Sequence, residues 1–274
     1  MPKVYLTFLS LILLVSCSDK KSIPKSATWE EVPTLQKSLD EAFLDGVIVV
    51  YDLTLDKYYT SNQALASVGQ LPASTFKIAN SIIALETGVM ASDTTLIKWD
   101  GESRAMKAWE EDLLFKQAFQ RSCVPCYQEI ARKIGTERMR SYLDKLDYGN
   151  IVFDSTTIDN FWLIGDSRIN PIAQIDFIKR LYQSELPIAD RTEGIMKRMM
   201  LMSQTDRFKL SGKTGWSIDK GFNNGWFVGF VEKANKTYFF ATNISPKPEF
   251  DMNEFSEIRK SLTLEALRHL EIIE

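Results

Sequence analysis

Residues 226–231 read Trp226-Phe227-Val228-Gly229-Phe230-Val231, and residues 237–244 form a second run rich in strand-forming side chains. Between them stands Lys233-Ala234-Asn235-Lys236, a short polar stretch typical of a turn. Two such runs joined by a turn predict an antiparallel hairpin. Near the other end of the chain, the β-branched run Val47-Ile48-Val49-Val50-Tyr51-Asp52 predicts a further buried strand.

The segment between these strands is mainly helical in pattern. From Ser74 to Leu85 apolar residues recur at helical spacing, and Gly88 follows as a stop signal. Residues 90–205 continue the helical pattern, with breaks at residues 148–150 and 170–171, and Phe208–Thr214 then alternates like a strand. A closing amphipathic helix is expected to contain the apolar residues Ile258, Leu262, Leu264, Leu267 and Leu270.

Strands at both ends of the chain, with helices inserted between them, predict an α+β fold. We expect an antiparallel β-sheet flanked by terminal helices, with a mostly helical inserted subdomain. The active site is expected where this helical insert meets the sheet.

The composition excludes several chemistries. Of the 274 residues, 45% are hydrophobic and 25% are charged, which is an ordinary globular balance. The formal net charge of −3 gives no broad attraction to nucleic acid, so no nucleic-acid partner is expected. The single histidine, His269, lies close to the chain end, where a Ser-His-Asp triad would have to use it. No zinc-type ligand cluster and no glycine-rich phosphate motif is present, so neither a metal nor a nucleotide cofactor is expected.

The N-terminus has the features of a targeting signal. Lys3 precedes an apolar run, Val4 to Ser16, that is too short for a stable membrane span. The run ends at Cys17, and polar residues follow, so residues 1–16 resemble a bacterial lipoprotein signal and residues 17–26 a tether. Lipidation of Cys17 would anchor a domain of residues 27–274 on the periplasmic side of a bacterial membrane. An ordinary secretory signal with an incidental cysteine is the alternative, and the protein would then be soluble in the periplasm.

Cys123 and Cys126 form a C-x-x-C sequence. In an oxidising compartment they could form a disulfide. The surrounding helical pattern favours the alternative, in which they are two small unlinked core side chains on one helical turn.

Ser74 and Lys77 open the first strong helical pattern, directly after Pro72-Ala73. Residues i and i+3 share a helix face, so the Lys77 amine can reach the Ser74 hydroxyl. Serine becomes a strong nucleophile only when a base takes its proton, and a neutral lysine can serve if burial lowers its pKa. The backbone N–H of Ser74, at the start of a helix, can point at an oxyanion.

Taken alone, S-x-x-K is weak evidence, because the sequence also contains it at Ser18, Ser22 and Ser217. The alternative for Ser74 is an N-terminal cap beside a lysine in solvent. A second motif, Lys213-Thr214-Gly215, supports the catalytic interpretation, since S-x-x-K and K-T-G occur together in serine β-lactamases and penicillin-binding proteins. A cationic Lys213 and a hydroxyl on a strand edge suit a substrate carboxylate, and Gly215 allows close approach to the strand.

With Ser122-Cys123-Val124 between these two motifs, the sequence resembles a class D, or oxacillinase-type, serine β-lactamase. The matching stretches, in family order, are Pro72-Ala73-Ser74-Thr75-Phe76-Lys77, Trp99-Asp100-Gly101, Ser122-Cys123-Val124, Tyr148-Gly149-Asn150, Phe161-Trp162-Leu163, Lys213-Thr214-Gly215-Trp216 and Gly225-Trp226-Phe227-Val228-Gly229. The resemblance implies the transpeptidase fold of serine β-lactamases and penicillin-binding proteins, with hydrolysis of penicillins and oxacillin-type β-lactams.

The resemblance also implies roles for individual residues. Ser74 would be the acylated nucleophile, and Lys77, carbamylated by carbon dioxide to N6-carboxylysine, would be the general base, with no other cofactor. Ser122 would relay a proton to the leaving nitrogen. The other implied roles are the substrate-carboxylate site (Lys213, Thr214, Arg259), the oxyanion hole (backbone N–H groups of Ser74 and Trp216), the hydrogen bond to the carbamate (Trp162) and the dry walls of the carbamate pocket (Val124, Leu163).

Other residues have alternative interpretations. Arg259 could instead be an exposed charge on the last helix, and Tyr148-Gly149-Asn150 is interpreted as a structural turn rather than a substrate contact. Trp99, Trp109 and Trp226 are expected in the core.

Two further functions compete with hydrolysis. The first is a β-lactam sensor that stays acylated, as in sensor domains of this family. The second is a peptidoglycan transpeptidase or carboxypeptidase, whose usual middle motif is S-x-N.

Overall fold

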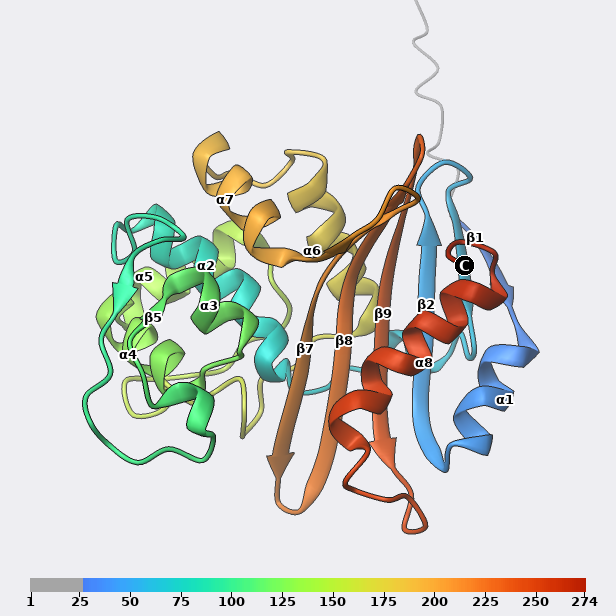
Figure 1. Cartoon of the computed structure of the whole chain (residues 1–274), viewed down its shortest axis with the longest axis horizontal. Coiled ribbons are helices and arrows are strands. Elements are labelled where there is room, and N and C mark those ends of the chain that lie inside the picture. Colours follow the sequence, from blue (N-terminus) through green and yellow to red (C-terminus); the bar gives the residue numbers. More distant parts are fainter. Residues whose placement is uncertain (1–26) are drawn as a thin grey trace, which may run out of the picture.

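The hairpin expected from residues 226–244 forms the middle of a seven-stranded sheet, shown in Figure 1. The structure, a computed structural model, describes residues 27–274. The signal and tether expected for residues 1–26 lie outside the described residues. The strand order is β1-β3-β2-β9-β8-β7-β6. The strands are β1 (Thr28–Glu31), β2 (Leu44–Asp52), β3 (Lys57–Thr60), β6 (Leu201–Gln204), β7 (Lys209–Asp219), β8 (Phe222–Lys233) and β9 (Lys236–Pro246).

The remaining elements are two short strands, three 3₁₀ turns and the helices. The short strands β4 (Leu96–Ile97) and β5 (Leu113–Leu114) pair with each other. The 3₁₀ turns are η1 (Leu65–Ser67), η2 (Ala73–Phe76) and η3 (Lys107–Trp109). The helices are α1 (Pro33–Glu41), α2 (Lys77–Glu86), α3 (Phe115–Gln120), α4 (Val124–Ile134), α5 (Thr136–Leu146), α6 (Pro171–Tyr182), α7 (Asp190–Met200) and α8 (Phe255–His269).

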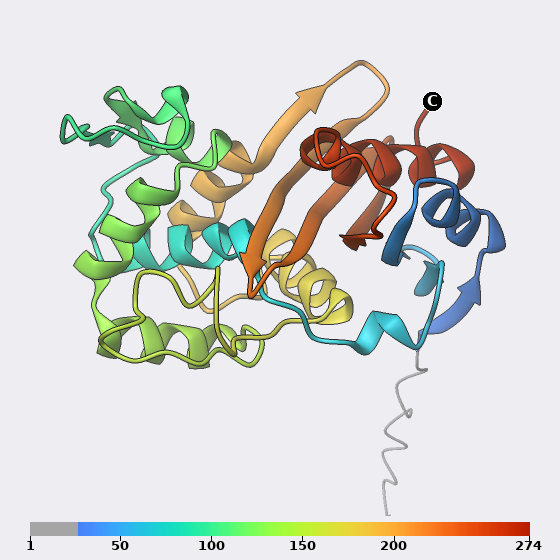
Figure 2. The same cartoon turned by 90° about the horizontal axis from the view of Figure 1, so that it is seen from below.

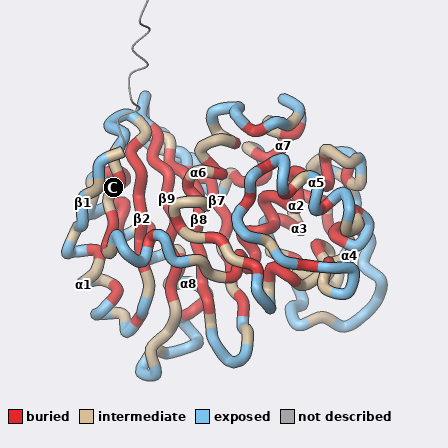
Figure 3. Tube along the Cα trace, turned by 180° about the vertical axis from the view of Figure 1, so that it is seen from behind, coloured by how far each residue is buried: buried red, intermediate tan, exposed pale blue. Residues whose placement is uncertain are grey.

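The sheet is buried on both faces, because successive side chains along its central strands point alternately into two different cores. Along β2, Val47, Val49 and Tyr51 face the core shared with the helical lobe, whereas Ile48 and Val50 face the core under α1 and α8. Figure 2 shows α8 and α1 on one side of the sheet and α6 on the other. Figure 3 shows burial along most of the central strands. The expected α+β architecture is therefore confirmed, with the helical subdomain inserted between β3 and β6.

Two details of the expected fold are wrong. The sheet is mixed, because β1 pairs with β3 in parallel. β2 and β3 form a hairpin and therefore run in opposite directions. β1 also runs opposite to β2 and pairs with the outer edge of β3, so β1 and β3 are parallel. Although the sequence predicts a helical pattern over residues 90–205, residues 90–114 contain two short strands and a 3₁₀ turn but no α-helix, and residues 147–170 contain no helix. There the Asp154 carboxylate accepts hydrogen bonds from the backbone N–H groups of Thr156 and Thr157, which competes with helix formation.

The tryptophans divide between core and surface. Trp226 is fully buried, as expected, and its indole N–H donates to the Leu71 carbonyl at 2.8 Å. Trp109 is half-buried, and Trp99 is 38% exposed, so the expectation of a core position is wrong for Trp99. Trp99 fails to enter the core because its loop is closed by polar contacts: its indole N–H donates to the Glu102 carbonyl.

Candidate active site

Ser74 and Lys77 meet at the junction between η2 and α2. Ser74 belongs to the 3₁₀ turn rather than to the α-helix expected from the sequence, and residues three apart eclipse each other in such a turn. The Lys77 Nζ donates to the Ser74 Oγ at 2.9 Å. Ser74 makes no capping hydrogen bond and Lys77 is fully buried, so the alternative of a cap beside a solvent-exposed lysine is wrong.

Lys77 lies in an environment that disfavours its charged form. Within residues 27–274 its ammonium group has one hydrogen-bond partner, Ser74, although it could donate three bonds. Burial, and next the charge of Lys213, hold the pKa of Lys77 well below its ordinary value of 10.5. Nζ lies 5.1 Å from the centroid of the Tyr127 ring, whose face offsets only part of the cost of burying a charged amine. The amine is thus set up to be neutral beside the hydroxyl.

The η2 turn is held from three directions. The Ala73 N–H donates to the Trp162 carbonyl at 2.7 Å, and the Asn224 side chain donates to the Leu71 carbonyl at 2.8 Å. On β7, a Cβ added to Gly215 would come within 3.2 Å of the Ser74 backbone nitrogen, so a larger residue would push the strand and the η2 turn apart by a few tenths of an ångström. Ala73 has φ of +50°, a strained conformation for a non-glycine residue, which these contacts maintain.

Ser122 faces the sheet from the loop between α3 and α4. The Lys213 Nζ donates to its Oγ at 3.0 Å and to the Thr214 carbonyl at 2.8 Å. Burial, and next the charge of Arg259, lower the pKa of Lys213 to about 7. Ser122 and Lys213 are 91 residues apart in sequence, and the packing of the helical lobe against β7 brings them together.

Arg259 is buried, with 6% of its surface exposed, so its interpretation as an exposed helix charge is wrong. Its Nη1 donates to the Gly215 carbonyl at 2.6 Å, and its Nη2 donates to the Ser256 carbonyl at 2.7 Å. Among the ion pairs of residues 27–274, none involves Arg259 or Lys213. Two buried cations without a carboxylate partner form a site suited to an anion.

Beside Lys213, a cavity of about 260 Å³ opens along β7. Thr214, which is half-buried, and Lys213 line it together with Phe119, Met199 and Leu201. A small molecule could contact Lys213 and Thr214 with a carboxylate and the three apolar residues with an apolar side chain.

Trp162 supplies an unpaired donor in the core. Its indole N–H is fully buried and has no hydrogen-bond partner among the described residues. Its ring stacks on Phe76, at 5.3 Å between ring centroids, and its backbone carbonyl holds Ala73. A buried N–H without an acceptor is costly, so this donor fits an added oxygen such as that of a carbamate. Val124 begins α4 and Leu163 follows Trp162, and both are half-buried.

Two buried polar pairs around the site have no distinct signal in the sequence. Tyr127 and Ser81 share a hydrogen bond of 2.7 Å between their hydroxyl groups, which turns the phenol oxygen to Ser81. The Gln174 amide donates to the Thr75 Oγ at 2.7 Å and supports η2 from α6. Both pairs join residues far apart in the chain.

Tyr148-Gly149-Asn150 forms a structural turn, as expected. The Asn150 N–H donates to the Arg168 carbonyl at 2.8 Å, and the Arg168 N–H donates back at 2.7 Å. Gly149 has φ of +60°, and Tyr148 is buried against Phe177. The motif therefore fastens the loop after α5 to the segment that follows Trp162.

The expectation of unlinked cysteines is wrong, because Cys123 and Cys126 form a disulfide. The reason is that α4 begins at Val124, so Cys123 lies outside the helix and its side chain can turn toward Cys126.

Within residues 27–274, no three His, Cys, Asp or Glu side chains gather in a group suited to a metal ion.

Comparison with known proteins gives close relatives over most of the chain. The family model of the penicillin binding protein transpeptidase domain matches residues 46–266. Beta-lactamase OXA-10 of Pseudomonas aeruginosa is 37% identical over 263 residues, which are 95% of this chain and 95% of that protein. A solved structure of a class D beta-lactamase from Nostoc has a TM-score of 0.83 and 40% identity, and the match covers 87% of this chain and 99% of that one.

A relative with a different role matches only in part. The chain is 30% identical over 255 residues to the regulatory protein BlaR1 of Bacillus licheniformis. The match covers 92% of this chain but 42% of that protein, so it corresponds to one part of a longer molecule.

Proposed function

The chain belongs to the class D β-lactamases, and from its site we propose hydrolysis of penicillins and oxacillin-type β-lactams through an acyl-serine intermediate, with a carbamylated Lys77 as general base. The observation that carries the proposal is the 2.9 Å hydrogen bond between a serine hydroxyl and the fully buried amine of Lys77, which has no carboxylate partner among residues 27–274. In water this amine would be protonated and would activate nothing.

The reaction requires two proton transfers at Ser74. The Ser74 Oγ loses its proton to the base and bonds to the lactam carbonyl carbon, and the backbone N–H groups of Ser74 and Trp216 stabilise the oxyanion. When the ring C–N bond breaks, the proton that the base took from Ser74 passes to the nitrogen through Ser122, whose Oγ is held by Lys213. A water molecule then cleaves the acyl ester and regenerates the Ser74 hydroxyl.

Carbamylation is supported by the surroundings of Lys77. A neutral amine is the form that reacts with carbon dioxide, and burial favours that form. The unpaired Trp162 indole N–H would bind the added group, and Val124 and Leu163 would limit its contact with water. When bound, the carbamate would supply an oxygen base beside Ser74.

We also propose a lipid anchor at Cys17, which would hold the enzyme on the periplasmic side of a bacterial membrane. The charged Lys3, the apolar run Val4 to Ser16 and the cysteine after it support this proposal. Helices long and apolar enough to span a bilayer are absent from the described part, residues 27–274.

The competing function is a β-lactam sensor or penicillin-binding protein that remains acylated, which the similarity to a regulatory protein favours. Purified protein mixed with a chromogenic cephalosporin separates the two functions. We expect continued release of product, many equivalents per protein molecule, because the same base can activate water. Release of about one equivalent of product, with no further release, would contradict hydrolysis and support the sensor.

The low pKa of Lys213 predicts how substrate binding depends on pH. Below about pH 7 the amine is charged and attracts the substrate carboxylate, whereas above this pH it is neutral in the free enzyme. The KM for a penicillin should therefore rise between pH 7 and 9, while the KM for its uncharged methyl ester stays nearly constant. Steady-state kinetics on both compounds checks this, and an equal rise for the ester would contradict the assignment.

A further inference from the structure

Ser122 occupies a position that usually belongs to glycine. It follows the last turn of α3, where its N–H donates to the Phe119 carbonyl at 3.1 Å and the N–H of Cys123 donates to the Ala118 carbonyl at 2.9 Å. This pair of bonds is a Schellman cap, whose central residue takes the left-handed conformation, and Ser122 has φ of +55°. Glycine adopts this conformation without cost but has no hydroxyl, so a serine here must be held in place.

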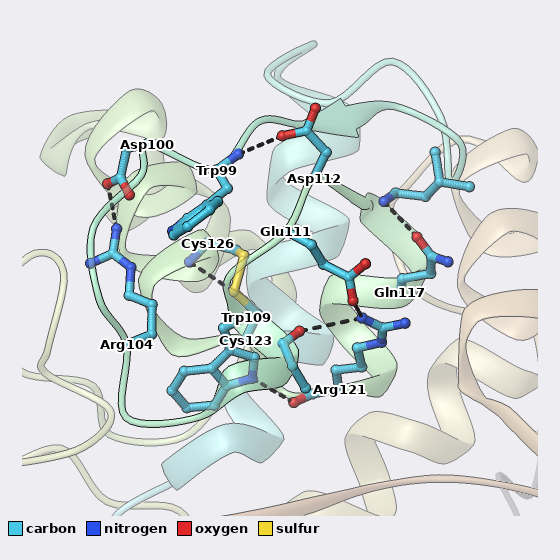
Figure 4. Close-up of a disulfide and its surroundings, with 12 residues drawn as sticks. Trp99, Asp100, Arg104, Trp109, Glu111, Asp112, Gln117, Arg121, Cys123 and Cys126 are labelled. Atoms are coloured by element: carbon cyan, nitrogen blue, oxygen red, sulfur yellow. Dashed lines mark hydrogen bonds and ion pairs between the residues drawn. A yellow bond between two sulfur atoms is a disulfide. The ribbon is translucent and has the colours of Figure 1, made fainter.

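Cys123 holds Ser122 from the next residue. It is also the N-cap of α4, and its Sγ accepts a hydrogen bond from the Cys126 N–H at 3.3 Å. Cys126 is the third residue of the helix, the position whose side chain completes a capping box in other proteins. Here the two side chains are joined covalently, as Figure 4 shows.

A second contact holds Ser122 from the preceding residue. The Trp109 indole N–H donates to the Arg121 carbonyl at 3.0 Å. The Arg121 guanidinium donates to the Ala108 carbonyl at 3.3 Å and pairs with Glu111. Figure 4 shows Trp109, Glu111 and Arg121 beside the disulfide turn. Ser122 therefore lies between a residue held by hydrogen bonds, Arg121, and a residue held by a disulfide, Cys123.

We propose that the Cys123–Cys126 disulfide is a positioning device for Ser122 in β-lactam acylation. By closing the first turn of α4 it keeps Cys123 at the N-cap, and this keeps Ser122 in the left-handed conformation that points its Oγ at Lys213, 3.0 Å away. The inference rests on the proposed function, because it assumes that Ser122 passes the proton to the leaving nitrogen. Loss of the disulfide should therefore slow acylation, which needs that proton, and leave the water-dependent step nearly unchanged.

The intact chain allows a test without mutation. Cys126 lines an open cleft of about 280 Å³, whereas Cys123 is fully buried. A water-soluble phosphine can attack the Cys126 sulfur; the S–S bond breaks, and Cys123 leaves as a thiolate and takes a proton. Water then converts the phosphonium adduct to a phosphine oxide and the Cys126 thiol.

Rapid-quench mass spectrometry gives the acylation and deacylation rates of the full chain with a penicillin. For the reduced protein and for Cys123→Ala/Cys126→Ala we expect acylation to fall roughly tenfold, the scale of a lost cap, with little change in deacylation. Cys123→Ser/Cys126→Glu, which rebuilds a non-covalent capping box, should recover most of the rate. The phosphine should not affect the double alanine variant.

A Ser122→Ala background makes the test specific. There, removing the disulfide should have almost no further effect on acylation, because the group that it positions is gone. The inference would be overturned if removing the disulfide slowed acylation as much in the Ser122→Ala background as in the wild type. It would also be overturned if loss of the disulfide from the wild type slowed acylation and deacylation equally, or left the acylation rate unchanged. If Ser122→Ala alone leaves acylation unchanged, the proton relay in the proposed function is wrong and the inference falls with it.

Discussion

Replacement of Ser74 by alanine is expected to abolish β-lactam turnover and covalent labelling by penicillin together. The variant lacks the oxygen that bonds to the lactam carbonyl carbon, while the anion site at Lys213 and Arg259 remains. We expect kcat to fall by roughly 10⁵-fold or more, as it does when a nucleophilic serine is removed from other hydrolases. Intact-mass spectrometry after incubation with penicillin should show no adduct.

Ser81→Ala is the matched control, because it removes another buried hydroxyl from the helix that follows η2. Ser81 shares its hydrogen bond with Tyr127 rather than with the nucleophile. This variant should keep labelling and turnover, although its Tm should fall because the Tyr127 hydroxyl loses a buried partner. A penicillin adduct on Ser74→Ala would assign the nucleophile to another residue.

Runs of β-branched and aromatic residues made the centre of the sheet predictable. Residues 47–51 are apolar throughout, which indicates a strand buried on both faces, whereas only the structure shows that Val47, Val49 and Tyr51 point to one core and Ile48 and Val50 to the other. The parallel pairing of β1 was not predictable in this way, because a four-residue strand carries too little periodicity to specify its neighbour.

The burial of Arg259 shows where helix periodicity was informative but incomplete. Phe255, Arg259, Leu262 and Ala266 share the buried face of α8. A charge at helical spacing with apolar residues is a signal for a buried cation, but the sequence does not show which partner lies opposite. That partner is the Gly215 carbonyl, 44 residues away, and only the docking of α8 against β7 brings them together.

The disulfide was missed for a local reason. With the helix assumed to run through Cys123, both cysteines would sit on one helical turn. The structure instead ends α3 with Ser122 in the left-handed conformation and starts α4 at Val124. Sequence patterns place helix ends only to within about 2–4 residues, and here one residue decides whether the two sulfur atoms can meet.

Replacement of Lys77 by methionine should remove the base and trap the acyl-enzyme. Methionine keeps the volume and the apolar contacts of the lysine stem, so the loss is that of the amine. We expect acylation to slow by roughly 10³-fold, the scale of a lost general base, and deacylation to slow at least as much. Mass spectrometry should then show a penicillin adduct that persists after free drug is removed.

Bicarbonate separates a carbamylated base from a plain amine. At acid pH the Lys77 amine of the wild-type protein gains a proton and can no longer bind carbon dioxide, so activity should fall as the pH is lowered through its depressed pKa. Added bicarbonate should restore activity to the wild type near that pH and should have no effect on Lys77→Met. A wild-type rate indifferent to bicarbonate, at all pH values, would contradict carbamylation while leaving the amine as base.

Lys77→Met should be more stable than the wild type. This expectation tests, without any substrate, whether burial keeps the Lys77 amine neutral. The pKa of Lys77 is lower in the folded chain than in the unfolded chain, so between the two values the unfolded state binds more protons and stability decreases as the pH falls. In buffer depleted of carbon dioxide, Lys77→Met removes this cost, and each kcal/mol gained should raise Tm by roughly 2–4 °C. The gain should shrink as the pH rises toward the ordinary lysine value of 10.5. A Tm difference independent of pH would mean that the amine is charged in the folded protein, and the mechanism built on its neutral form would fail.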